Sequence, residues 1–521
     1  MKRIATILLA LTATSLHCAA QTIDDGLWMS QRYTNGTARF VSMGGAFGAL
    51  GSDFSSIDVN PAGLGVYRTS EFTLSPSFSN IKARTSYLGT PTPEVERSFA
   101  LDNMGFVFAI NPTGNTDHGL CQLNLSFGYN RHNNFKSNTL VKGLSPHSSI
   151  LDVFTAKANY INPEPDDLQF WFDSTGYMTW DPTVQTSVPW DAIMAWNTYL
   201  LDDDGNQYWS VLDKHFGAVT QTQRTLSEGN MGEFNMSAAL SIAHKLYLGL
   251  SAGITSYRSE QNIKHHEEAD ITNLPSLNGL LFSDMDFYQY LSTESSGFNM
   301  KLGAIYTPIP MLRLGLSVHT PTFYKVKHRY SYNMTSTVQV YDSIGYEQWQ
   351  LDDDIRSRFS GSYSYRFDSP FRLSGSAAVV LGGMALVSVD AELVNYAAMR
   401  FHHGVDGDDL ADLNELAHKT YRNVVNIKAG GEVLLGPVAL RAGYALYPSP
   451  YRNNSHYSSL TQLISGGVGY SLGSGFFIDA AYQQQLSSNK YRLYKWDDVY
   501  SEPVQTRYST SKFLLTLGFR F

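Results

Sequence analysis

The sequence predicts an all-β protein: a transmembrane antiparallel β-barrel of about fourteen strands, with an N-terminal hatch that plugs its lumen. Three observations predict this fold. Segments of alternating apolar and polar residues recur from residue 71 to the C-terminus, the connections between them alternate between long and short, and the chain ends on Phe521. Alternation places every second side chain on one face of a strand, as a wall between lipid and lumen requires.

The composition fits a barrel better than a bundle of membrane helices. Charged residues make up 16% and aromatic residues 13% of the 521 residues, and the mean hydropathy is −0.21. Only alternate residues of a barrel strand face lipid, so such a protein needs no long apolar run. The net charge of −9 excludes a general nucleic-acid binder. Composition alone also allows a secreted multidomain β protein.

The first twenty residues form an expected signal peptide. Lys2 and Arg3 precede an apolar run, and residues 18–20 are small, so we expect cleavage before Gln21 and a final location in the outer membrane of a Gram-negative cell. Cys121 is then the only cysteine of the mature chain. An internal disulfide and a cysteine-based metal site are therefore excluded.

Residues 21–67 form the expected hatch. This stretch is dense in Gly, Ala and Ser, with large apolar side chains such as Phe47 and Phe54 among them. Small residues let backbone segments approach closely. The run Asn60, Pro61, Ala62, Gly63 is typical of a tight turn, because Pro fixes φ and Gly frees it.

The run of small residues that ends in Asn60-Pro61-Ala62-Gly63-Leu64-Gly65, shortly after a signal peptide, resembles the hatch of the FadL/TodX-type outer-membrane transporters of hydrophobic compounds. The resemblance implies a fourteen-stranded barrel with this motif in its plug. It implies that ligands are caught by outer loops, enter an apolar lumen and leave sideways as the hatch shifts. Gating would then rest on Asn60, Pro61, Ala62, Gly63, Phe47 and Phe54.

The barrel is expected over residues 68–521. Its predicted strands cover residues 71–81, 102–110, 119–131, 231–243, 247–257, 298–307, 312–324, 359–381, 385–399, 423–434, 438–446, 460–470, 476–486 and 507–521. The predicted outer loops cover residues 133–227, 260–296, 328–356 and 400–421. Long outer loops and short periplasmic turns are typical of bacterial barrels, and closure removes every sheet edge.

Alternation also assigns faces. Cys121 and Leu123 are expected on the lipid face, and Leu250 outward beside an inward Ser251. A set of charged residues is expected in the lumen, where the charges either form a structural network or steer a substrate. The set comprises Arg313, Arg372, Asp390, Glu392, Glu432 and Arg441, with Lys301, Lys428 and Asp479 beside them. His319 also points inward, as a ligand for haem or metal or as a hydrogen-bonded bystander.

The longest predicted loop holds five of the eight tryptophans. Residues 149–158 and 189–201 within it have the pattern of amphipathic helices. Exposed aromatic side chains can capture hydrophobic molecules, and they can equally pack the loop against the barrel rim. The candidates for capture are Trp171, Trp180, Trp190 and Trp196, and the fifth is Trp209. The run from His265 to Glu268 is expected to be a solvated loop.

No catalytic motif has its required context. Two G-x-S-x-G matches occur, at residues 249–253 and 469–473, and neither lies on a strand-to-helix elbow. We therefore expect no enzyme, no cofactor and no metal. The predicted function is outer-membrane transport of a hydrophobic compound by a monomeric barrel, in contact with lipid and lipopolysaccharide. The alternatives are a binding protein of a type IX-like secretion system and haem uptake.

Overall fold

The computed structural model describes residues 23–110, 119–174, 178–181, 186–212, 218–269, 280–341, 346–352, 359–404, 410–452 and 460–521. The expected signal peptide, residues 1–20, and its cleavage before Gln21 lie outside the described residues. Among the described residues, no helix is both long and apolar enough to cross a membrane.

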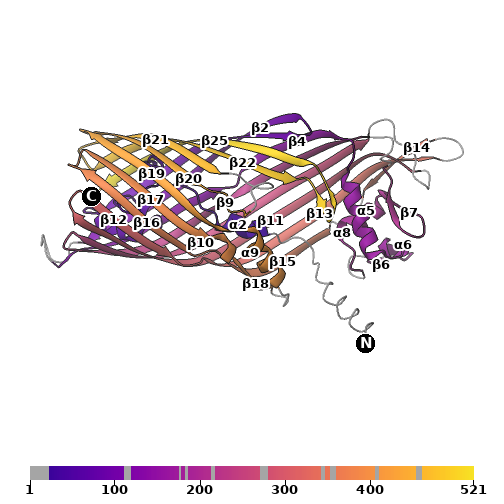
Figure 1. The fold of residues 1–521 in the computed structure, drawn as a ribbon, viewed down its shortest axis with the longest axis horizontal. Coiled ribbons are helices and arrows are strands. Elements are labelled where there is room, and N and C mark those ends of the chain that lie inside the picture. The colour runs from indigo at the N-terminus through magenta and orange to yellow at the C-terminus, as the bar shows by residue number, and fades with distance from the viewer. Residues whose placement is uncertain are drawn as a thin grey trace.

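Fourteen antiparallel strands close into a barrel, because β1 pairs with β2 on one side and with β25 on the other. The predicted fold class is confirmed (Figure 1). The ring consists of β1 (Glu71–Tyr87), β2 (Thr90–Ile110), β3 (Leu120–Asn134), β9 (Val219–Ile242), β10 (Leu246–Ala269), β11 (Leu280–Ile309), β12 (Leu312–His319), β16 (Arg372–Leu381), β17 (Ala385–Asn395), β19 (Asn423–Leu435), β20 (Val438–Tyr447), β21 (Thr461–Ser471), β22 (Phe476–Arg492) and β25 (Pro503–Arg520).

The other strands of the sheet lengthen this wall at one end. They are β4 (Ser137–Ser145), β13 (Phe323–Tyr341), β14 (Tyr346–Asp352), β15 (Phe359–Asp368) and β18 (Arg400–Gly404). Two of the predicted strands are therefore each split in two. Pro321 separates β12 from β13, and Pro370 separates β15 from β16. Proline cannot donate to the ladder, so it interrupts pairing there.

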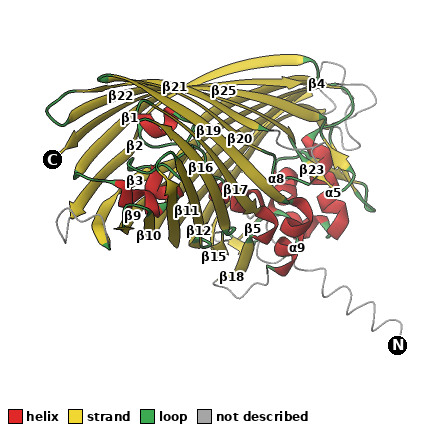
Figure 2. Cartoon of the chain, turned by 60° about the vertical axis from the view of Figure 1, so that its left-hand side comes forward, coloured by secondary structure: helices red, strands yellow, loops and turns green. Residues whose placement is uncertain are grey.

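The two ends of the barrel differ. Tight hairpins such as those at Gly382 and Gly436 lie at the end that holds the C-terminus, which we name the turn end. Helices gather at the opposite end, which we name the loop end (Figures 1 and 2). They are α5 (Ile150–Ile161), α6 (Pro165–Leu168) and α8 (Trp190–Asn197), with the small hairpins β5 (Trp171–Phe172)–β6 (Met178–Trp180) and β7 (Leu201–Asp203)–β8 (Tyr208–Ser210).

The remaining loop-end elements are η3 (Tyr396–Ala398), α9 (Ala411–Thr420) and the hairpin β23 (Lys495–Trp496)–β24 (Val499–Tyr500). Helix α5 begins where the sequence predicts it, because Ser149 and Asp152 form a capping box around its first turn. Helix α8 follows Pro189 as its N-cap.

The predicted wall faces hold at the tested pair. Leu250 is 42% exposed, whereas its neighbour Ser251 is 1% exposed and accepts a hydrogen bond from Ser237 at 2.8 Å. The same alternation leaves apolar side chains outward on strand after strand, such as Phe234, Phe298 and Leu316.

Two predictions need correction. The segments expected as outer loops are in large part strand, since β10 continues to Ala269 and β11 begins at Leu280. Both faces of these extensions carry polar residues, so the alternation that marks a membrane strand is lost. Cys121 is not on the lipid face: it is 3% exposed, because the β3–β9 register shifts between Leu120 and Gln122 and moves it out of step with Leu123.

Candidate functional site

Residues 23–67, which we name the N-terminal segment, lie between opposite walls of the barrel. The segment contains α2 (Ile23–Ser30), α3 (Ala38–Ser42), α4 (Ser56–Val59) and the 3-10 helix η1 (Pro61–Val66). Helix α3 contacts β20, β21, β22 and β25, and η1 contacts β3, β9, β10 and β11. Figure 1 places α2 about halfway along the barrel.

Asn60 ties the turn of this segment to the wall. Its Oδ1 accepts a hydrogen bond from Ala62 N at 3.1 Å, and Pro61 occupies the first turn of η1. The Asn60 Nδ2 donates to Gly48 O at 2.6 Å and to Ala304 O of β11 at 3.2 Å. The Asn60 side chain is itself buried, and with these three contacts it fixes both the turn and its place on β11.

The predicted aromatic residues of the segment are fully enclosed. Phe47 is not exposed at all, and Phe54 is 1% exposed. The ring of Phe47 packs on Phe40 with centroids 5.4 Å apart, and the ring of Phe54 lies directly over Gly105 and Gly128 of the wall. The roles of these residues in gating stay predictions.

Glycines of the wall make room for the segment's backbone. A Cβ on Gly303 would clash with Asn60, one on Gly249 with the Pro61 backbone, and one on Gly315 with Gly48. Across the lumen, a Cβ on Gly430 or Gly443 would clash with the Met43 backbone. We name these five the docking glycines. They bring the two backbones closer than any side chain would allow.

The predicted lumen charges form contacts with the segment or with one another. Arg39 of the segment meets Glu432 at 3.0 Å, and Glu432 and Asp479 both contact Arg441 at 2.5 Å. The remaining contacts are from Arg313 to Leu50 O at 2.8 Å, from Gly48 N to Asp390 at 2.9 Å, and from Arg372 to Glu392 at 2.9 Å and to Ser30 O. This pattern supports the structural-network interpretation. His319 contacts Val59 O of the segment at 3.0 Å.

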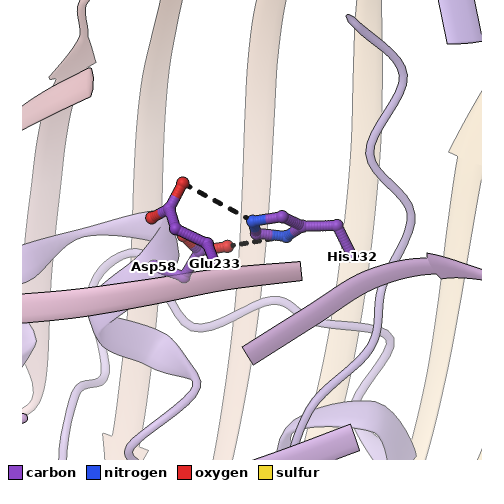
Figure 3. Close-up of side chains that lie close together, drawn as sticks. All are labelled: Asp58, His132 and Glu233. Carbon is purple, nitrogen blue, oxygen red and sulfur yellow. Dashed lines mark ion pairs between the residues drawn. The ribbon is translucent and has the colours of Figure 1, made fainter. Parts of the chain in front are cut away.

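A second buried charge cluster joins the segment to β3, β9 and β11 (Figure 3). His132 Nδ1 of β3 lies 3.3 Å from Asp58 of α4, and its Nε2 lies 3.7 Å from Glu233 of β9. Lys301 Nζ of β11 contacts both carboxylates, and Arg32 of the segment reaches Glu233 at 3.5 Å. We name these five residues the ionic latch.

Hydrogen bonds complete the latch around its most buried member. Glu233 is fully buried and accepts from Asn299 at 2.8 Å and from Thr255 at 3.0 Å. A buried carboxylate is tolerated only when it is paired and hydrogen-bonded, and Glu233 meets both conditions.

Three latch residues have the chemistry of metal ligands. The ligand atoms of Asp58, His132 and Glu233 all lie within 4.8 Å of one another. The Lys301 ammonium, however, already contacts both carboxylates, and so supplies the positive charge that an ion would bring. The arrangement is therefore an ion-pair cluster and not a metal centre.

The latch sits where the wall loses its backbone ladder. Strands β2 and β3 pair only from Asn103–Asn130 to Ile110–Leu123. Beyond Asn130, toward the loop end, β3 turns inward and residues 131–133 are all buried. Among the described strands, β2 from Thr90 to Leu101 is hydrogen-bonded by a ladder to β1 alone. We name this line between β2 and the β3–β4 segment the seam.

Side chains close the seam instead of backbone hydrogen bonds. Glu96 pairs with Lys136 at 3.0 Å, Asp102 lies 3.8 Å from Arg131, and Asn138 donates to Glu94 at 3.3 Å. The N-terminal segment holds the inward turn of β3 from behind: Asn35 donates to His132 O at 2.5 Å, and Asn133 donates to Gln31 O at 2.7 Å. Side-chain contacts can part without breaking a sheet, so the wall is held less firmly along the seam than along a paired ladder.

Two cavities lie near the seam and the N-terminal segment. One of about 240 Å³ adjoins the seam and is lined by Trp28, Asn35, Asp102, Arg131 and Phe135 among others. The other, of about 710 Å³, lies between the segment and the loop end. Its lining mixes Trp28, Phe135, Tyr330, Tyr332 and Tyr491 with many Ser, Thr, Gln and Asn side chains, such as Thr225, Ser259, Gln261, Gln289 and Asn489. We name it the chamber. The apolar lumen that the resemblance implies is here a mixed aromatic and polar one.

The tryptophans of the loop end are divided. Trp190 packs on the buried core that covers the loop end, with its ring 5.5 Å from that of Tyr330, and Trp196 lies against Tyr208 at 5.6 Å. Trp171 and Trp209 are 47% and 46% exposed. The side chain of Trp180 lies outside the described residues. Packing thus accounts for Trp190 and Trp196, while capture by the others stays a prediction.

The run from His265 to Glu268 is strand and not a solvated loop, which corrects the prediction. Glu267 is fully buried and accepts from Ser149 Oγ and Ile150 N, so it holds the first turn of α5. His266 faces the other way, with Nδ1 2.8 Å from Asp286. The hydrogen bond to Asp286 raises the pKa of His266. Burial opposes ionisation of Asp286, yet His266 and Lys264 lower its pKa to about 2.

Sequence reasoning missed the ionic latch as a unit. Lys301 was placed inward by alternation, and the same rule places Glu233 inward beside the outward Phe234. No sequence pattern joins them to Asp58 and His132, because the segment and the inward turn of β3 are irregular.

Fold and site together define a closed β-barrel whose lumen holds its own N-terminal segment. No protein-family model and no curated protein matches the chain. Solved structures of other proteins share the fold. A FadL homologue from Pseudomonas aeruginosa matches with a TM-score of 0.55 at 14% identity over 94% of this chain and 100% of that one. The toluene transporter TodX from P. putida matches with a TM-score of 0.50 at 12% identity over 94% and 99%.

Proposed function

We propose that the protein is an outer-membrane transporter of hydrophobic compounds, which takes up its ligand at the loop end and releases it sideways through the seam. One observation carries this proposal. The wall lacks a ladder at one line, and the N-terminal segment holds that line shut through the ionic latch and the Asn35 and Asn133 hydrogen bonds. A shift of the segment would release the inward turn of β3.

The outward face supports placement in a membrane. Exposed apolar side chains follow one another along the strands, as with Leu248, Leu250 and Ile254 of β10, which are 38%, 42% and 60% exposed. A sideways exit then delivers an apolar solute directly into the lipid. It avoids the unfavourable transfer of apolar surface into water at the turn end.

The shared fold adds support for this class of cargo, since TodX, one of the structures with this fold, is a toluene transporter. The lining of the chamber indicates which kind of hydrophobic compound fits. A pure hydrocarbon would displace water from the chamber's hydroxyl and amide groups without replacing the lost hydrogen bonds, whereas the aromatic rings can pack against the apolar part of a ligand. The ligand class that fits best is therefore amphipathic, such as a long-chain fatty acid.

The alternatives have no specific support. The inward histidines His265 and His328 contact protein groups through both ring nitrogens, at distances of 2.8 to 3.2 Å, so neither is free to bind a haem iron. His319 contacts Val59 O through Nε2 at 3.0 Å. No feature of the described wall favours a secretion partner.

Uptake by whole cells tests the proposal. Cells with and without the protein in their outer membrane are given a fluorescent long-chain fatty acid and, separately, a small hydrophilic dye. We expect faster uptake of the fatty acid only, and native mass spectrometry of the purified barrel should show co-purified lipid. Equal uptake with and without the protein would contradict the proposal. A stoichiometric iron porphyrin or a stoichiometric protein in the spectrum would replace it with haem uptake or secretion.

A further inference from the structure

A row of basic side chains crosses the outer face of three neighbouring strands. Lys325 of β13 lies directly opposite Arg366 of β15, and Arg366 lies directly opposite His402 of β18. Lys325 and Arg366 are exposed, and the His402 side chain is 41% exposed. Lys327 continues the row toward the loop end on β13. We name these four residues the basic row.

The basic row begins where the apolar outer face ends. Ile254, Phe298 and Phe323 lie opposite one another on β10, β11 and β13, and are 60%, 46% and 52% exposed. Lys325 follows Phe323 by two residues, a step of about 7 Å along the strand. A lysine or arginine at this level can extend its charged end into the headgroup layer while its stem rests on lipid.

Lys325 and Arg366, the two directly opposed cations of this row, have no ion-pair partner among the described residues. Like charges directly opposite each other across strands are destabilising. The acids nearby are already engaged: Asp368 pairs with His402 at 2.7 Å, and Glu294, which lies directly opposite Lys327 on β11, pairs with Arg329 at 3.1 Å. Within the described part of the chain, no acidic group lies within ion-pair distance of Lys325, Lys327 or Arg366. The row borders a hollow of about 1220 Å³. An anion seated there would relieve the repulsion.

We propose that the basic row binds a phosphate group of lipopolysaccharide, with the acyl chains of that lipid against Phe323 and Phe298. Arginine and lysine are the side chains that hold phosphate, and arginine can do so with two hydrogen bonds. The apolar row directly below favours a phosphate carried by a lipid over a free ion in solution. This inference rests on the proposed outer-membrane location but not on the proposed transport.

Retention of lipopolysaccharide by the purified full-length barrel tests the site. The double variant Lys325→Ala/Arg366→Ala is compared with wild type and with Arg258→Ala. Arg258 is the matched control because it is an exposed outward cation at the level of Lys327, already paired with Glu260 at 2.5 Å. Native mass spectrometry counts the lipopolysaccharide retained, and heat-modifiable gel mobility confirms that each variant is folded.

We expect the double variant to bind lipopolysaccharide at least about 10-fold more weakly, since two charge-assisted contacts are lost. Arg258→Ala should match wild type, and dephosphorylated lipopolysaccharide should bind wild type as weakly as the intact lipid binds the double variant. Equal retention by wild type and double variant would overturn the proposal. Equal retention of the dephosphorylated lipid would also overturn it, as would binding of inorganic phosphate without retained lipid. Fatty-acid uptake measured on the same variants should stay at the wild-type rate, which separates this site from transport.

Discussion

The N-terminal segment meets the barrel wall in two chemically different ways. Along β10, β12, β19 and β20 its backbone lies against four of the docking glycines, and on β11 the Asn60 side chain lies against Gly303. The glycines themselves offer no side chain that could rotate away. At β3 and β9 it is held by the charged side chains of the ionic latch. The first kind of contact can be lost only if backbones separate. The second can be lost when side chains exchange partners, so the comparison assigns anchoring to the glycines and release to the latch.

Breaking the latch at its centre should have the largest effect. Lys301→Met keeps the volume of the side chain but leaves Asp58 and Glu233 buried without their shared cation. Removing one partner of a buried ion pair costs about 3–5 kcal/mol. We expect the barrel to remain closed and the N-terminal segment to loosen. Limited proteolysis of the folded barrel should then cleave within residues 23–67, and resistance equal to wild type would argue against the latch.

Filling a docking glycine should displace the segment from the wall. Gly303→Val places its side chain against Asn60, and overpacking of this kind costs about 1–3 kcal/mol. Gly375→Val on β16 is the matched control, because a Cβ there meets nothing within 4 Å. The unfolding midpoint in denaturant should fall for Gly303→Val and hardly change for Gly375→Val. Equal midpoints would mean that the close contact between Gly303 and Asn60 does not contribute to stability.

Removing the Asn60 side chain tests the turn that lies between Asp58 of the ionic latch and the backbone that packs on the docking glycines. Asn60→Ala leaves buried carbonyl groups of Gly48 and Ala304 without their donor, at a cost of about 1–3 kcal/mol. We expect heat-modifiable mobility to be unchanged and fatty-acid uptake to change, since the wall itself is untouched. Uptake and hydrophilic-dye leakage that both match wild type would leave this turn with a structural role only.

The smallest effect is expected from a partly exposed ion pair, which can be compared with the buried latch. Asp286→Asn removes the partner of His266 and Lys264 between the loop-end parts of β10 and β11, where an ion pair near the surface is worth about 0–1 kcal/mol. Because the pKa of His266 is raised, its contribution is complete below the ordinary pKa and is lost as pH rises through the raised value. Hydrogen exchange of these strand ends should therefore distinguish Asp286→Asn from wild type at pH 5.5, and less so at pH 8.5. A difference that grows with pH would reverse this sign.

The barrel strands could be predicted from the sequence more completely than the contacts of the site. Period-two alternation is strong wherever one face meets lipid, which is why Leu250 and Ser251 could be placed on the correct faces. The signal fades where both faces are polar, so the loop-end parts of β10 and β11 were expected as loops. It also fails at single-residue insertions, and the bulge at Cys121 is one of these.

The site could be predicted only where it lies on regular strands. Alternation along a strand predicts that charged residues such as Arg372 and Glu432 point into the lumen. It does not predict which residues of the N-terminal segment they contact. His132 illustrates the reason: it belongs to the inward turn of β3, whose direction is set by contacts with Asn35 and Asp58 that are far apart in sequence.

Cross-links that fix each kind of contact test the central claim, that release occurs at the β3 turn while the glycine-docked side stays in place. The first pair, Ser55→Cys/Asn130→Cys, joins the segment to β3 where Ser55 Oγ and Asn130 Oδ1 are 3.2 Å apart. The second pair, Ser42→Cys/Ser465→Cys, joins it to β21 on the opposite wall, where Ser465 donates to Ser42 O at 3.1 Å. Cys121 is replaced by Ser in both.

Fatty-acid uptake is then measured before oxidation, after oxidation and after reduction, with the cross-linked fraction read from gels. The account predicts that oxidation of the first pair stops uptake and reduction restores it, whereas the second pair transports at the same rate in both states. Full transport through the cross-linked first pair would contradict the account directly.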